Sequence, residues 1–318
     1  MKYGFLLLGI ALAVSACTKD NCSPIYPDEK GKLVSPALYA TTASSPFTGV
    51  LEVYPCTAGT STYFGNYYND QLMAFNAFYY IRDGSIYQAH RPVLLPTGTY
   101  NLLYWGTTQT QASYPFQVAV GEAALTLGGD LAKQTLQLRK TSKIGDTVYM
   151  PVYDLVHSVR SVKIGTESIA VPLQRAVAGL TVVLRKKDGS RLDASIDSVE
   201  VLIGPVAGAL NFYTAVPENF SKTIQFPLRM AADSLQATNP MAMLFPSAPA
   251  PILTIVLTLK NGQERVSRVA LENALTANTK LIVTVDMGEI LSEETEGNGF
   301  EVSNWNEKHE TIDSGIFG

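Results

Sequence analysis

Alternation of apolar and polar residues, interrupted by glycine turns, constrains this chain most. In the stretch PILTIVLTLK every second residue from Leu253 to Leu259 is leucine or isoleucine, so these side chains share one face of an extended strand. Asn261-Gly262 follows, and this dipeptide favours a tight hairpin because such turns need positive φ angles. Residues 263–271 and 280–287 are expected to be further strands.

The same pattern recurs elsewhere in the chain. Asp83-Gly84 joins AFYYIR to SIYQAH, and Asp188-Gly189 follows LTVVLRKK. Helical periodicity is nearly absent, and only residues 228–237 are compatible with a short helix. Short strands separated by glycine turns are typical of β-sandwiches and β-barrels. The sequence therefore predicts an all-β protein.

Two strand-rich blocks suggest two domains, which suits a chain of 318 residues. They are separated by a less regular stretch, HSVRSVKIGTES. We expect an N-terminal β-sandwich over residues 33–160. A C-terminal β-sandwich with a polar tail is expected over residues 161–318.

The N-terminus has the pattern of a secretory signal. Lys2 precedes an apolar run from Phe5 to Val14, which is too short for the ~20 residues that span a membrane. Val14-Ser15-Ala16 and Cys17 then resemble the signal of a bacterial lipoprotein. In that reading residues 1–16 are removed and Cys17 carries the lipid. An ordinary signal with a chance cysteine at the cut is the alternative.

Residues 17–32 contain prolines, glycine and charges with little apolar pattern, which predicts a lipidated, flexible tether. No aspartate follows Cys17 directly, and Lys19-Asp20 resembles a surface-export signal. The expected location is the cell outer membrane, with a lipid anchor and an outward-facing body.

Composition argues against some functions. The chain has 24 Lys and Arg against 28 Asp and Glu, without the basic patch of a nucleic-acid binder. Cys22 and Cys56 could form a disulfide in an exported protein, although Cys22 lies in the tether. The three histidines are far apart in sequence, and no catalytic or metal-binding motif occurs. We therefore expect no enzyme activity, no metal and no cofactor.

Three segments in order carry a family resemblance. They are PTGTY running into NLLYWG (96–106), VPLQRAVAGLTVVL (171–184) and FEVSNWN (300–306). Behind a lipidated cysteine, this order resembles the FimB-type fimbrial anchor family within the fimbrillin-like proteins of type V pili. The resemblance implies two tandem transthyretin-like (Greek-key) β-sandwiches.

The resemblance also implies a mode of assembly. In these pili a protease, often specific for arginine, removes the first strand of each stalk subunit (fimbrillin), and a neighbour's C-terminal strand fills the groove. Anchor members keep their first strand and their lipid. This chain has no arginine before Arg82, which fits an uncleaved anchor, although Lys30 and Lys32 could serve another protease.

The C-terminal segment is the expected contact with a stalk subunit. Its candidate donor-strand residues are Phe300, Val302, Ile312, Ile316 and Phe317. The alternative is that the segment through Trp305 completes the chain's own second sandwich and the tail frays.

The expected function is therefore a minor pilus subunit that tethers the fibre to the outer membrane and limits its length. One alternative is a tip or accessory adhesin of the same pilus family. Another is a glycan-binding surface lipoprotein, in which aromatic residues such as Tyr63-Phe64 and Tyr67-Tyr68 would stack on sugars.

Overall fold

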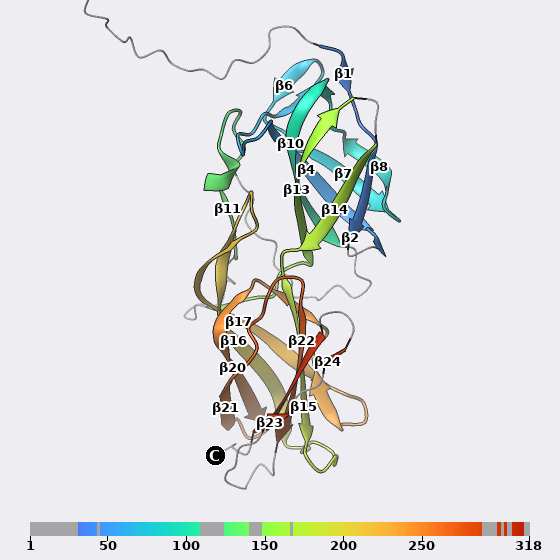
Figure 1. The fold of residues 1–318 in the computed structure, drawn as a ribbon. Helices are drawn as coiled ribbons and strands as arrows, with labels where there is room; N and C mark the ends of the chain where they lie inside the picture. Colours follow the sequence, from blue (N-terminus) through green and yellow to red (C-terminus); the bar gives the residue numbers. More distant parts are fainter. Residues whose placement is uncertain are drawn as a thin grey trace, which may run out of the picture. The chain divides into compact units, whose positions relative to one another are not determined.

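The structure is a computed structural model. It describes residues 31–42, 45–108, 124–139, 148–165 and 168–287, and the backbone of strands at 298–299, 302–303 and 307–314. The described residues are almost entirely β, which confirms the predicted fold class (Figure 1).

The first large sheet has eight strands in the order β14-β13-β10-β4-β7-β8-β2-β3, and β14 also pairs with β2, so the sheet closes on itself. Its strands are β2 (Leu38–Thr42), β3 (Ser45–Pro46), β4 (Gly49–Thr57), β7 (Ala77–Arg82), β8 (Ser85–Arg91), β10 (Gly98–Thr108), β13 (Leu155–Ile164) and β14 (Ile169–Arg175). Two small pairs accompany it: β1 (Leu33–Val34) with β9 (Leu95–Pro96), and β5 (Asn66–Tyr68) with β6 (Gln71–Met73).

The interior of the closed sheet holds one hydrophobic core. Tyr100, Leu102 and Tyr104 alternate along β10, and all three are buried in this core. The intervening Leu103 and Trp105 point the other way and pack in a second core. The period of two in the sequence is thus the period of the strand.

The second large sheet follows the order β21-β20-β16-β17-β18-β15-β22-β25-β23. Its main strands are β15 (Ala178–Lys186), β16 (Ile196–Asn211), β17 (Pro217–Met230), β18 (Gln236–Thr238), β20 (Ser247–Leu259), β21 (Glu264–Ala270), β22 (Lys280–Met287), β23 (Asn298–Gly299) and β25 (Glu307–Ser314). Short strands pair at its sides: β11 (Thr135–Gln137), β12 (Val148–Tyr149), β19 (Ala242–Leu244) and β24 (Val302–Ser303).

The hairpins were predicted better than the one helix. Asp83 and Gly84 both have positive φ angles, 49° and 80°, as a tight hairpin requires. In the Asn261-Gly262 turn only the glycine does, at 81°. The helix considered at 228–237 is wrong, because β17 continues to Met230 and β18 begins at Gln236. Within the described ranges the single helix is a 3₁₀ turn, η1 (Leu131–Lys133).

The chain passes from the first large sheet to the second after the predicted domain boundary at residue 160. β13 runs through that position and pairs with β10 from Leu155 to Ile164, and β14 belongs to the same sheet. The change falls between Arg175 and Ala178, where β15 opens the second sheet. Exposed polar residues along β13 hide its strand period in the sequence, which explains why HSVRSVKIGTES looked irregular.

The turn between β16 and β17 contacts the first sheet. The Trp105 indole Nε1 donates to the Phe212 carbonyl oxygen at 2.8 Å, and the two rings stack with centroids 6.0 Å apart. The His157 Nε2 lies 3.0 Å from the Tyr213 carbonyl oxygen, and burial lowers the pKa of His157 to about 4. These contacts join residues that lie far apart in the sequence.

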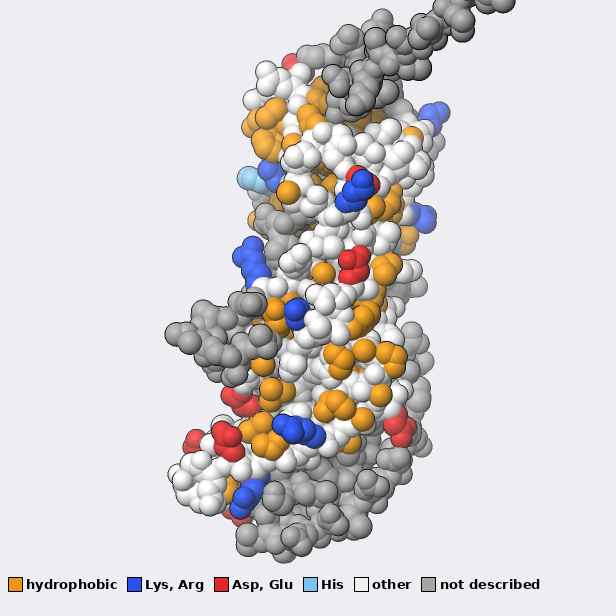
Figure 2. Space-filling model, turned by 90° about the vertical axis from the view of Figure 1, so that its left-hand side faces the viewer, with side chains coloured by type: hydrophobic (Ala, Val, Ile, Leu, Met, Phe, Trp, Pro, Cys, Tyr) orange, Lys and Arg blue, Asp and Glu red, His pale blue; other side chains and the backbone are white. Residues whose placement is uncertain are grey.

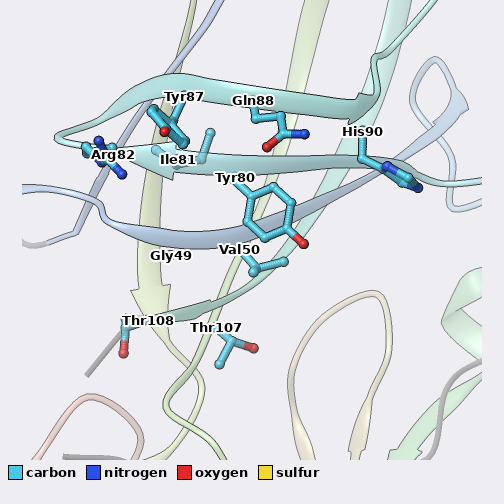
Figure 3. Close-up of a pocket in the computed structure, with 10 residues that line it drawn as sticks. All are labelled: Gly49, Val50, Tyr80, Ile81, Arg82, Tyr87, Gln88, His90, Thr107 and Thr108. Carbon is cyan, nitrogen blue, oxygen red and sulfur yellow. The ribbon is translucent and has the colours of Figure 1, made fainter. Parts of the chain in front are cut away.

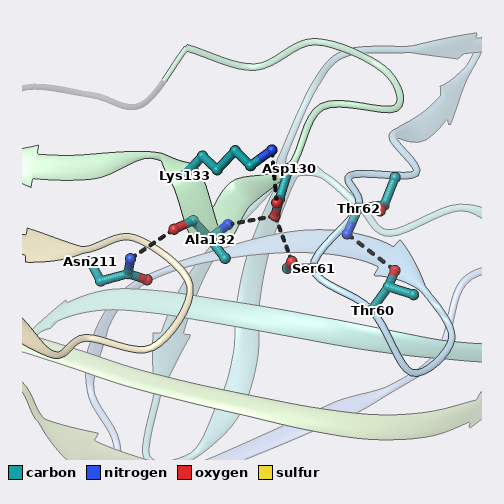
Figure 4. A network of polar contacts seen from close by, with 7 residues as sticks. All are labelled: Thr60, Ser61, Thr62, Asp130, Ala132, Lys133 and Asn211. Carbon is teal, nitrogen blue, oxygen red and sulfur yellow. Dashed lines mark hydrogen bonds and ion pairs between the residues drawn. The ribbon is translucent and has the colours of Figure 1, made fainter.

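A polar network beside this turn involves η1 (Figure 4). The Asp130 carboxylate accepts from the Ser61 hydroxyl at 2.6 Å and from the Ala132 amide at 3.0 Å, and so caps η1. The Asn211 side chain donates to the Ala132 carbonyl at 2.8 Å. The hydrogen bonds from Ser61 and from the Ala132 amide lower the pKa of Asp130. Gly128-Gly129-Asp130 is therefore part of a structural turn.

Candidate functional site: the two terminal strands

The N-terminal strand β2 is built into the first sheet. It runs parallel to β14, with Leu38 opposite Ile169 and Thr42 opposite Leu173. On its other side Tyr39 pairs with Ser85 of β8, and the Ala40 amide donates to the Gly84 carbonyl at 2.8 Å. β2 thus closes the sheet between two strands that come from distant parts of the chain.

Burial also fixes β2 in place. Leu38 is 5% exposed and Ala40 is fully buried, and both belong to the core of the first sheet. Removing this strand would uncover that core and leave edges of β14 and β8 unpaired. Because an unpaired edge is a template for pairing with another chain, β2 occupies the position that a donated strand would need.

The first arginine of the sequence cannot release β2 alone. Arg82 is the last residue of β7 and directly precedes the Asp83-Gly84 turn. A cut after Arg82 would fall after β2, β3, β4 and β7, in the middle of the sheet. An arginine-specific protease therefore has no position that separates only the first strand.

The C-terminal strand β25 also lies in a sheet. It runs parallel to β22 over eight residues, from the pair Lys280 and Glu307 to the pair Met287 and Ser314. Among the described residues, its other side pairs with β23 and β24, which have two residues each. The described part of the expected donor segment therefore completes the chain's own second sheet.

The structure describes only some of the candidate donor residues. Val302 lies in β24 opposite Lys308, and Ile312 lies in β25 opposite Val285. Phe300, Ile316 and Phe317 lie outside the described residues, as does Trp305. The backbone around Ile312 is not free for a neighbour in this structure, and its donation stays a prediction.

The cysteines are also placed only in part. Cys17 and Cys22 lie outside the described residues, so lipid attachment and the disulfide stay predictions. Cys56 lies in β4 as a fully buried, free thiol, 3.7 Å from the Tyr54 carbonyl oxygen. Burial, helped by Asp130, raises the pKa of this thiol to about 12, so it stays protonated and unreactive.

Arg175 lies in the segment VPLQRAVAGLTVVL of the family resemblance, and the structure gives it a partner that the sequence did not. Its guanidinium Nε lies 3.0 Å from an oxygen of the buried Asp154, which also accepts from the Thr108 hydroxyl at 2.5 Å. The pair lies between β14 and the start of β13, near the change from the first sheet to the second. The signal for it was a lone aspartate among apolar residues in VYDLV.

The loop aromatics considered for sugar stacking are mostly core residues. Tyr63 is fully buried and Tyr67 is 9% exposed, whereas Tyr68 is 53% exposed. In the described residues no group of three His, Cys, Asp or Glu side chains could hold a metal ion. No helix in the described part is long and apolar enough to cross a bilayer. The face in Figure 2 carries acidic and basic side chains interspersed rather than in one large patch.

Solved structures with a similar fold include candidate adhesins, a candidate cell adhesion protein and a fimbrial anchor protein. A candidate adhesin from Bacteroides ovatus is 10% identical with a TM-score of 0.51, and the match covers 86% of this chain and 92% of that one. The fimbrial anchor protein Mfa2 from Porphyromonas gingivalis is 13% identical with a TM-score of 0.45, covering 75% and 83%. A candidate cell adhesion protein from Bacteroides uniformis is 15% identical with a TM-score of 0.47, covering 89% and 98%.

The fold is shared with the candidate adhesin from Bacteroides ovatus. Residues 34–311 match the model of the fimbrillin-A associated anchor proteins Mfa1 and Mfa2, and the chain belongs to this family. The match begins at β1 and ends within β25, so it includes both terminal strands. It confirms the resemblance to a fimbrial anchor family. A search of curated protein sequences finds no match.

Proposed function

We propose that this chain is a lipid-anchored minor pilus subunit that tethers the fibre to the outer membrane and limits its length. Its partner is the fimbrillin stalk subunit, and its work is assembly without turnover. The observation that carries the proposal is that β2 closes the first sheet between β14 and β8. A subunit whose own strand closes the sheet has no groove there for a neighbour's strand, so strand exchange ends at this subunit.

The membrane side of the proposal rests on Cys17. Acyl chains on this cysteine would hold the protein at the membrane, because two or more chains give stable anchoring. Residues 17–32 would then be the tether from the lipid to β1. With no arginine before Arg82, an arginine-specific protease leaves lipid and body in one chain.

The fibre side of the proposal rests on segment 300–318. Donation of β25 to a stalk subunit requires it to leave β22, with which it pairs over eight residues. Its other neighbours are two strands of two residues each, so one side of β25 is weakly held. Release of β25 exchanges backbone pairs within the chain for similar pairs with the neighbour.

Deletion of the gene and complementation with variants tests this function. Without the protein, fibres should be longer and should be shed into the medium. Cys17→Ser should fail to restore attachment, whereas the neighbouring Cys22→Ser should restore it. Unchanged fibre length and retention in the deletion strain would contradict the proposal. Antibody labelling at the free fibre end would instead indicate a tip adhesin.

A further inference from the structure

An open pocket of about 570 Å³ lies on the outer face of the first sheet (Figure 3). Tyr80 and Arg82 of β7 line it together with Tyr87, Gln88 and His90 of β8. Thr107 and Thr108 of β10 and Gly49 and Val50 of β4 line its other side. Neither the core nor the proposed assembly function needs this arrangement of side chains.

Two bulges in β8 form the pocket. Tyr80 pairs with Gln88 and Ile81 with Ile86, which leaves Tyr87 as an extra residue. Phe78 pairs with Arg91 and Tyr79 with Ala89, which leaves His90 as a second one. Bulges redirect side chains and are common next to functional sites. Here both extra residues line the pocket.

The aromatic rings of the pocket are exposed and supported. Tyr80 is 43% exposed and Tyr87 is 61% exposed. The ring of Phe78 meets Tyr80 edge-on at 5.4 Å and His90 at 6.1 Å, so it holds both in orientation. Exposed, oriented aromatic faces are suited to stacking on a flat ligand with apolar and polar sides.

The charge of the pocket selects the kind of ligand. No Asp or Glu lines it, whereas Arg82 does. The Arg82 guanidinium lies 3.8 Å from the centroid of the Tyr87 ring, and within the described residues it has no hydrogen bond or ion pair. The nearby Glu52 carboxylate accepts from the Tyr54 hydroxyl at 2.5 Å. An available guanidinium is matched to a carboxylate or sulfate group.

We propose that this pocket binds an anionic saccharide. A sugar ring stacks on Tyr80, its acidic group pairs with Arg82, and its hydroxyls bond with Gln88 and Thr107. The alternative is that a protein partner adds a strand to β8. In the described residues β2 pairs with β8 at Ser85, so most of this edge of β8 is left for another strand. The two bulges argue against it, since bulges twist an edge away from pairing.

Titration calorimetry on the full-length chain in detergent tests the proposal. The probes are an oligogalacturonide, a sialyllactose and a heparin tetrasaccharide, with a neutral galactose oligomer for comparison. Saturable binding is expected for at least one anionic probe and weaker binding for the neutral one. Arg82→Gln and Tyr80→Ala should each weaken binding roughly tenfold. The matched variants Arg268→Gln and Phe220→Ala, exposed on the second sheet, should bind as the wild type does.

Several results would overturn the proposal. It would be overturned if no anionic probe bound saturably, or if both pocket variants bound as the wild type does. An equal loss of binding in Arg268→Gln would also overturn it, because that would indicate charge attraction alone. Hydrogen exchange of the wild type gives a second readout that no variant can confound by unfolding. The bound probe should slow exchange in residues 77–91 and not in β21. Protection confined to the β8 edge by an acidic peptide, without competition by the saccharides, would indicate strand addition instead.

Discussion

β2, the first strand of the first large sheet in chain order, and β25, the last described strand, are held in different ways. β2 has partners on both sides, closes its sheet, and buries Leu38 and Ala40 in the core. β25 has one full partner, β22, and two strands of two residues each on the other side. The first sheet closes on itself, whereas the second is open and has β25 near one end of its strand order.

In the proposed function, this difference separates a strand that is kept from one that is exchanged. A strand that closes a sheet removes two edges at once, so its loss exposes both edges and the core. A strand near an open edge loses fewer contacts when it leaves. Polymer growth needs one open groove and one free strand per subunit. A subunit with a filled groove and an exchangeable strand can only end a fibre.

A disulfide between β22 and β25 is the strongest test of the comparison. Val285 and Ile312 are paired parallel residues, and the ~4.8 Å between neighbouring strands suits a disulfide. Val285→Cys with Ile312→Cys should abolish fibre attachment, and reductant should restore it, because β25 can then leave its sheet. The measurement is the fraction of fibres retained on cells.

A matched crosslink serves as its control. Val182 and Val283 are also paired parallel residues, in β15 and β22, which stay together in the proposed exchange. Val182→Cys with Val283→Cys should leave attachment unchanged. If the variant with the β22–β25 disulfide still attaches fibres normally, β25 does not need to leave its sheet, which contradicts the proposed exchange.

A charge in the core face of β2 should destabilise the first sheet. Leu38→Asp places an unpaired carboxylate in the core and should lower the free energy of unfolding by about 3–5 kcal/mol. Its neighbour Tyr39 is 42% exposed, so Tyr39→Ser should change stability by less than ~1 kcal/mol. Urea unfolding compares the two, and equal effects would mean that β2 is not part of the core.

His157 should make the contact between the first sheet and the β16–β17 turn sensitive to pH. Its pKa is lowered from 6.5 to about 4 by burial, so the unfolded chain takes up a proton at higher pH than the folded chain. The stability contribution is complete above pH 6.5 and is lost as the pH falls toward 4, up to ~2 kcal/mol for a partly exposed ring.

The measurement is the difference in unfolding free energy between pH 7 and pH 4.5. His157→Gln should show a smaller difference than the wild type. His90→Gln, on the exposed pocket face, should match the wild type. Identical pH dependence in all three proteins would contradict the assignment.

Hydrogen exchange should show the smallest but most local difference. Amides of β25 should exchange roughly tenfold faster than those of β2, because elements with few partners open without global unfolding. Mass spectrometry of peptides covering 38–42 and 307–314 measures this. Faster exchange in β2 than in β25 would reverse the comparison.

Local patterns predicted much of this fold. The alternation in PILTIVLTLK gave the buried face of β20, where Leu253, Leu257 and Leu259 are all buried. The Asp83-Gly84 hairpin followed from backbone preferences that the two residues carry themselves. Periodicity and turn chemistry are local properties, so they can be seen in one sequence without an alignment.

Long-range pairing could not be predicted in the same way. Nothing local in LYATT indicates that it pairs with IAVPLQR, which lies far along the chain. The bulges that redirect Tyr87 and His90 depend on the register between two strands rather than on either strand alone. The resemblance predicted the terminal strands as the site, but only the pairing showed that β2 closes the first sheet and that β25 pairs with β22.

The most direct test of the central claim is the intact mass and N-terminus of the protein purified from its native membrane. The account predicts an acylated Cys17 in a chain that continues unbroken through β2 to Gly318. A lipid-free chain that begins after Lys30, after Lys32 or within β2 would contradict it. Such a product would show that the first strand is removed and that the protein polymerises as a stalk or tip subunit.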